Sequence, residues 1–217
     1  MKVYYDKLKF LLTDAPGFFK SVQKEKDYWT VLKFYILLAA IVQVVSYLIY
    51  IPSYLKQSNL WGIMGLGFIG NIAAAFIFPF IFSAVFYLGV LVFKGEKGYF
   101  NMFKSTAYSM AVLSAYGFVS AIIIGVISWF MPPDFSTILQ GGNSFVYSLP
   151  VTIISGVIGL IGVVHFVYTL INGLEYYQKL SQGKALVTII VIPVVLTFII
   201  GLIFGSGIAL ILGSLGY

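Results

Sequence analysis

Five long apolar segments constrain the fold of this chain more than any other feature. A membrane-spanning helix rises about 1.5 Å per residue through a hydrocarbon core about 30 Å thick, so it needs about 20 apolar residues. The segments of that length are about 31–51, 63–93, 105–131, 149–173 and 185–213. They predict an all-α fold, a polytopic membrane bundle of five transmembrane helices. The second segment contains Pro79, so we expect it to tilt or kink.

The composition agrees with a surface that faces lipid. Of the 217 residues, 60% are hydrophobic and 9% are charged, whereas a typical soluble domain has about 25% charged residues. The absence of cysteine excludes disulfides and thiolate metal ligands, and a single histidine excludes a His-rich metal site. The net charge is +6, but the lysines cluster at the ends of the apolar segments, so we do not expect nucleic-acid binding.

The distribution of lysines orients the predicted spans. Six lie in residues 1–30, three follow the second span and two follow the fourth, eleven in all. These are Lys2, Lys7, Lys9, Lys20, Lys24, Lys26, Lys94, Lys97, Lys104, Lys179 and Lys184. The opposite side has Lys56 alone. Because cytoplasmic loops are rich in lysine, we expect a multi-pass protein of the cell membrane with a cytoplasmic N-terminus and its C-terminus outside.

Residues 1–30 form a predicted cytoplasmic segment that precedes the transmembrane domain of residues 31–217. On a helical wheel its apolar side chains share one face, which comprises Tyr4, Leu8, Leu11 and Leu12. This pattern is typical of a helix in the membrane interface, with anionic lipid headgroups as its partners. Asp14 and Pro16 then predict the start of a second short helix. The alternative is a solvated basic lead-in to the first span.

Small residues recur every four positions in the last span. They are Gly201, Gly205, Ala209 and Gly213. Such spacing lets helix backbones approach closely in a membrane. The stripe indicates helix packing, either within one chain, which we favour, or between chains of a homo-oligomer.

Polar side chains inside the spans are candidate functional residues, because their burial in lipid is costly. Gln43 lies in the first span and Asn71 in the second. In the fourth span, one helix face carries a polar stripe that consists of His165, Tyr168, Asn172 and Glu175. This stripe opens toward the cytoplasm. The alternative, which we favour, is a histidine paired with a neighbouring helix beside ordinary interfacial residues.

Enzyme signatures are absent from the sequence. It contains no H-E-x-x-H, P-loop or G-x-S-x-G pattern. No acidic pair lies within the spans, which argues against a proton-coupled transporter. We therefore expect neither an enzyme nor a bound cofactor.

Three stretches resemble the Yip1 domain family in its compact prokaryotic form. The first is the lead-in Asp14-Ala-Pro-Gly-Phe-Phe19, and the second is Ala107-Tyr-Ser-Met-Ala111. The most specific is Leu170-Ile-Asn-Gly-Leu-Glu-Tyr-Tyr-Gln-Lys-Leu-Ser-Gln-Gly-Lys-Ala185, where one span ends and the next begins.

The resemblance implies a membrane scaffold or membrane organiser without catalytic activity. Eukaryotic relatives act in vesicle traffic and bind small GTPases and partner membrane proteins. Their cytoplasmic region is much longer than the N-terminal segment here, so we do not extend GTPase binding to this chain. The alternative function is a small transporter or channel component, which the polar stripe of the fourth span would serve.

Overall fold

The structure of the chain is a computed structural model that describes residues 2–55, 60–96, 98–130 and 149–214. The side chains are described within residues 2–49, 65–96, 98–127 and 149–199. The described residues form helices joined by short turns and linkers, with no strand among them. Its helices are α1 (Lys2–Thr13), α2 (Ala15–Ser21), α3 (Tyr28–Leu55), α4 (Leu60–Val92), α5 (Tyr99–Phe130), α7 (Leu149–Gln178) and α8 (Gln182–Ser214).

Five of these helices are long and apolar enough to cross a membrane. The qualifying stretches are Tyr28–Ile49, Gly65–Val92, Tyr99–Ile127, Leu149–Gln178 and Gln182–Ile199. The predicted all-α, five-span fold is confirmed. One detail was wrong, because α5 begins at Tyr99 and therefore includes Lys104, which the lysine count had placed in a loop.

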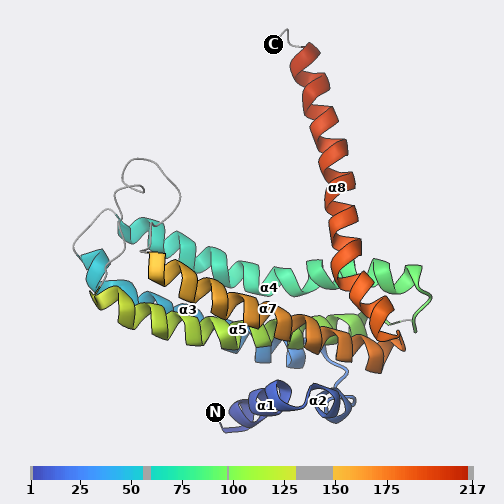
Figure 1. The fold of residues 1–217 in the computed structure, drawn as a ribbon, viewed down its shortest axis with the longest axis horizontal. Helices are drawn as coiled ribbons and strands as arrows, with labels where there is room; N and C mark the ends of the chain where they lie inside the picture. The colour runs from blue at the N-terminus through green and yellow to red at the C-terminus, as the bar shows by residue number, and fades with distance from the viewer. Residues whose placement is uncertain (1, 56–59, 97, 131–148, 215–217) are drawn as a thin grey trace.

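Four of the spans lie side by side, and the fifth departs from them (Figure 1). Helices α3, α4, α5 and α7 form the bundle, while α8 contacts α4 and α7 and projects away at a steep angle. Helices α1 and α2 lie against the opposite side of the bundle, where α1 contacts α5 and α2 contacts α7. The N-terminal helices therefore cover the side of the bundle opposite α8, near the start of α5 and the end of α7.

Helix α5 is the centre of the molecule. Every residue from Met102 to Val112 is buried, as expected for a helix with neighbours on all sides. The hydroxyls of Ser105, Thr106 and Ser109 donate to the carbonyls four residues earlier at 2.9, 3.0 and 2.8 Å. These polar side chains are thereby satisfied within the core.

Capping interactions fix where the short elements begin. The Asp14 carboxylate accepts a hydrogen bond from the Gly17 amide at 3.0 Å, which confirms the predicted N-cap of α2. Asp27 caps α3 by accepting from the amides of Trp29 at 3.2 Å and Thr30 at 2.9 Å. Two aspartates thus fix where α2 and α3 begin.

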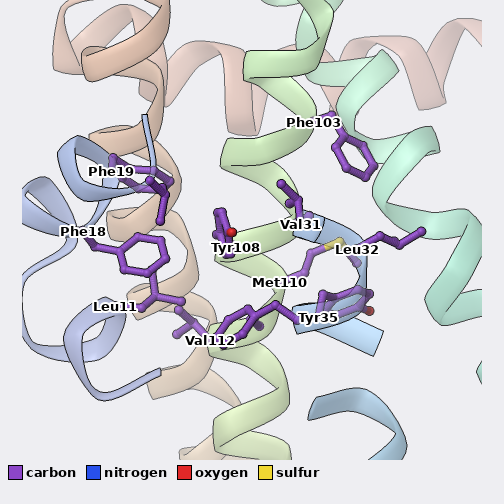
Figure 2. Close-up of a cluster of buried hydrophobic side chains, with 14 of the residues drawn as sticks. Leu11, Phe18, Phe19, Val31, Leu32, Tyr35, Phe103, Tyr108, Met110 and Val112 are labelled. Carbon is purple, nitrogen blue, oxygen red and sulfur yellow. The ribbon is translucent and has the colours of Figure 1, made fainter. Parts of the chain in front are cut away.

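The apolar face of α1 packs against the bundle. Leu11 is fully buried and joins Phe18, Phe19 and Tyr108 in one core cluster (Figure 2). Leu8 and Leu12 are partly buried against the same cluster, and the Tyr4 ring stacks on Phe34 with centroids 6.2 Å apart. The four residues expected to face the membrane interface therefore contact protein in this arrangement. Contact of the segment with lipid headgroups stays a prediction.

Candidate functional site

The side chains of the polar stripe of α7 contact residues on the same helix and on neighbouring elements. The His165 Nδ1 atom lies 3.1 Å from the hydroxyl of Tyr116 on α5, so the histidine is paired with a neighbouring helix. Its ring centroid is 6.2 Å from that of Tyr168, which is 52% exposed. The Asn172 amide donates to the Tyr168 carbonyl at 2.8 Å. Exposed Glu175 accepts a bond from Gln182 at 3.5 Å. The pairing of His165 with Tyr116 is the kind of contact that the favoured alternative describes, and a functional role of the stripe stays a prediction.

Gln43 and Asn71, by contrast, come together. Both line a cavity of about 240 Å³ between α3 and α4, to which α5 contributes Ser114 and α3 contributes Tyr35. Within the described part of the chain, neither amide has a hydrogen-bond partner. The cavity thus offers donors and acceptors inside otherwise apolar walls. Sequence reasoning selected each residue, but only the fold shows that they line the same cavity.

A second group of polar side chains joins the N-terminal helices to the bundle. We call it the junction, and it consists of Lys7, Glu25, Lys104, Tyr108 and Tyr177. Its elements are α1, the linker between α2 and α3, α5 and the end of α7. Sequence analysis missed this group. The available signal was the polar run Lys104-Ser-Thr106 at the start of an apolar segment.

Lys104 is the most deeply buried charge of the junction, at 1% exposure. Its ammonium donates to three backbone carbonyls of the linker, those of Val22 at 3.2 Å, Gln23 at 3.4 Å and Glu25 at 3.0 Å. It also lies over the Tyr177 ring, 4.5 Å from the centroid. All three N–H groups of the lysine are thus used to hold the linker against α5.

Glu25 forms the other half of the junction. Its carboxylate accepts from the Lys7 ammonium at 2.8 Å and from the Tyr108 hydroxyl. The Lys7 ammonium also donates to the Tyr108 hydroxyl at 2.6 Å and lies 4.7 Å from the centre of that ring. Because these groups satisfy one another, the junction fastens α1 to α5 and leaves no free nucleophile–base pair.

Helix α2 is fastened in a similar way. The hydroxyl of Tyr177 donates to the Phe19 carbonyl at 2.8 Å, and the hydroxyl of Tyr176 donates to the Gln23 side chain at 3.0 Å. Gly173 lets α7 approach, because a Cβ built there would lie 2.8 Å from Ser105 Cβ and 3.0 Å from Phe19 Cζ. Hydrogen bonds and close packing together dock the whole N-terminal segment.

Comparison with known proteins decides the family. The model of the Yip1 domain matches residues 11–205. The chain belongs to the Yip1 domain family. No curated protein and no solved structure matches it closely enough to add a named relative.

The extent of the Yip1 match agrees with the packing. It begins at Leu11, the α1 residue that is buried against the bundle, and ends within α8. The Yip1 match therefore covers α2, the helices α3, α4, α5 and α7, and α8 as far as residue 205.

The small-residue stripe of the last span lies largely outside the part of the chain whose side chains the structure describes. Gly201, Gly205, Ala209 and Gly213 all follow residue 199, so their predicted packing role stays a prediction. Close contacts occur instead at other glycines. A Cβ at Gly89 of α4 would lie 2.6 Å from Thr188 Cγ2 of α8, and one at Gly162 of α7 would lie 3.0 Å from Tyr116 Cβ of α5.

Proposed function

We propose that this Yip1-domain protein is a non-enzymatic membrane scaffold that organises lipids or partner membrane proteins, in membrane trafficking or lipid organisation. The surface that does so is the N-terminal platform, defined as α1, α2 and the linker up to Asp27. The observation that carries the proposal is the junction, because it holds this platform rigidly against the bundle through Lys104 and Glu25.

The outer face of the platform suits a scaffold. Apart from Lys7 and Glu25, which belong to the junction, the charged residues of the platform are exposed, and Val3 and Tyr5 are 76% and 67% exposed. Exposed apolar side chains among lysines favour contact with a membrane surface or with another protein at that surface. The inner face is fully used in packing, so partners would engage the platform without dismantling it.

Orientation is part of the same proposal. The platform contacts the start of α5 and the end of α7, so the lysine-rich segments gather at one end of the bundle. Because cytoplasmic loops are rich in lysine, this distribution supports our proposal that this end faces the cytoplasm of a cell-membrane protein.

Site-specific photo-crosslinking in native membranes tests the scaffold. A photo-reactive amino acid at Tyr5 should form adducts of discrete mass with a phospholipid or a membrane protein. The same group at Leu11, which is 0% exposed, is the matched control and should react only within the chain. Equal adduct patterns at both positions would remove the platform as an interaction surface.

A small transporter or channel component is the second candidate function, favoured by the cavity that Gln43 and Asn71 line. Liposomes containing the purified protein should show no solute or ion flux if the scaffold proposal holds. Flux that the double substitution Gln43→Leu, Asn71→Leu abolishes would establish the transporter instead.

A further inference from the structure

A polar cavity of about 440 Å³ lies next to the junction, where the linker, the turn between α4 and α5 and the end of α7 meet. Its volume falls within the range of about 300–1,000 Å³ that is usual for small-molecule sites. Lys26, Lys104 and Lys179 contribute cations to its walls, and Glu96 and Asn101 contribute a carboxylate and an amide. Glu25 also lines the cavity, but its carboxylate is already paired with Lys7 and Tyr108. The contacts within the junction do not fill this cavity, although Glu25, Lys104 and Tyr177 line it.

The polar groups in the cavity walls differ in how many of their hydrogen-bonding positions are already used. Lys104 uses its three N–H groups on linker carbonyls, so it supplies charge rather than a free donor. The Lys179 ammonium donates one hydrogen bond, to the Tyr176 carbonyl at 2.9 Å. Among the described residues, Lys26 and the Glu96 carboxylate have no hydrogen-bond or ion-pair partner. Two cations and one carboxylate are thus available to a ligand.

The depth of the cavity in the membrane follows from helix length. Helix α5 has 32 residues, and at 1.5 Å per residue it is about 48 Å long, close to the roughly 40–45 Å of a bilayer that includes its headgroups. The ends of α5 therefore lie at headgroup level. The cavity is built on the first turns of α5 and the last turn of α7, so it lies at that level too.

We propose that this cavity binds the headgroup of a phospholipid that carries both a phosphodiester and a primary ammonium, the phosphoethanolamine class. Lys26 and Lys179 bind the phosphate oxygens in the field of Lys104, and Glu96 binds the ammonium. A purely anionic headgroup would leave Glu96 unpaired beside it. This inference rests on the proposed membrane-organising function and names a ligand for it.

Lipid retention by the full-length protein is the test. The protein, purified in detergent and exchanged with equal amounts of phosphatidylethanolamine and phosphatidylglycerol, should retain mainly the former, as measured by mass spectrometry. Lys26→Gln and Lys179→Gln should each weaken retention by about fivefold, the factor that corresponds to about 1 kcal/mol per headgroup contact. Glu96→Gln should remove the preference for phosphatidylethanolamine.

Exposed Lys20 of α2 does not line the cavity, so Lys20→Gln is the matched control and should retain lipid as the unaltered protein does. Unfolding temperatures of all variants would show that the fold is intact. Equal retention of both lipids by the unaltered protein would overturn the proposal, as would unchanged retention by the double lysine variant.

Two further comparisons distinguish a lipid phosphate from free phosphate, and this inference from the proposed scaffold function. Displacement of the lipid by inorganic phosphate would identify a free-phosphate site and overturn the lipid assignment. If the protein showed no lipid selectivity but the photo-reactive group at Tyr5 still formed adducts, this inference alone would be overturned. Loss of both would overturn the scaffold as well.

Discussion

The ammonium of Lys104 is buried among backbone carbonyls rather than against a carboxylate. A buried charge needs such compensation, because desolvation alone is very unfavourable. The carbonyls come from the linker between α2 and α3, and of the three only that of Val22 also accepts a backbone bond within the described part of the chain, from the Glu25 amide at 3.1 Å. The ammonium and the linker carbonyls therefore satisfy one another. A single side chain on α5 thereby determines the path of a segment about 80 residues earlier in the chain.

Lys104→Met should destabilise the protein by about 2–3 kcal/mol, since hydrogen bonds from a charged donor contribute about 1.5–3 kcal/mol each and the freed carbonyls can partly rehydrate. Thermal unfolding in detergent measures the change, and limited proteolysis should cut the linker faster. Lys24→Met, in the same linker but exposed, is the control and should behave like the unaltered protein. Similar stability of the two variants would contradict the structural role of Lys104.

Asp27 gives the start of α3 a pH dependence. The Thr30 hydroxyl, at 2.9 Å, and the amides of Trp29 and Thr30 donate to its carboxylate, and these bonds hold its pKa below the ordinary 3.8. A lowered pKa means that the fold favours the ionised form. The cap is therefore complete above the ordinary carboxyl pKa and is lost as the pH falls through the lowered value.

Hydrogen exchange checks this prediction. Protection of the amides of residues 29–31 should decrease at acid pH, after correction for the intrinsic exchange rate. Asp27→Asn provides the control, because asparagine caps helices about as well but does not titrate. Its protection should be independent of pH over the same range, and a parallel decrease in both proteins would refute the role of Asp27.

At the scale of elements, α7 carries two kinds of glycine. Gly173 lies where α2, α5 and α7 meet, whereas nothing lies within 4 Å of a Cβ built on Gly159. The first position permits docking of the N-terminal helices. The second faces away from the described part of the protein and has no such role.

Gly173→Ala should destabilise the protein by about 1–3 kcal/mol, the usual range for overpacking a core. The added methyl group would displace Ser105 or Phe19 and loosen α2. Gly159→Ala should cause no loss of stability. Unfolding temperatures and proteolysis of residues 14–27 measure both effects, and equal behaviour of the two variants would show that α2 is not held by this contact.

The elements themselves could be predicted from the sequence, because hydropathy and span length depend on local residues. Caps such as Asp14 are equally local, and this one was found. Lys104 was misplaced because its burial depends on carbonyls of Val22 and Gln23, which no local pattern reveals. The same reason applies to Gln43 and Asn71, which share a cavity only because α3 and α4 pack together.

For the whole molecule, the distribution of lysines and the packing of the helices indicate the same orientation in the membrane. The platform, the start of α5 and the turn between α7 and α8 lie at one end of the bundle, and these are the lysine-rich segments. The surface along α3, α4 and α7 is apolar, and side chains such as Leu48, Phe78 and Leu160 are exposed on it. Exposed apolar groups at these positions are explained by lipid contact.

Single cysteines in this cysteine-free chain test the orientation. Cysteine at Lys20 in α2 and at Gln182 in α8 should be shielded from an impermeant thiol reagent in intact cells, because both positions belong to the end that we place in the cytoplasm. Cysteine at Gly142, between α5 and α7 in the sequence, should be labelled. After permeabilisation all three should react, which controls for burial, since Lys20 and Gln182 are exposed on the protein. Labelling of Lys20 and Gln182 from opposite sides would contradict the docking of the platform, because Tyr176 near the end of α7 bonds to Gln23. Labelling of all three in intact cells would instead reverse or remove the proposed topology.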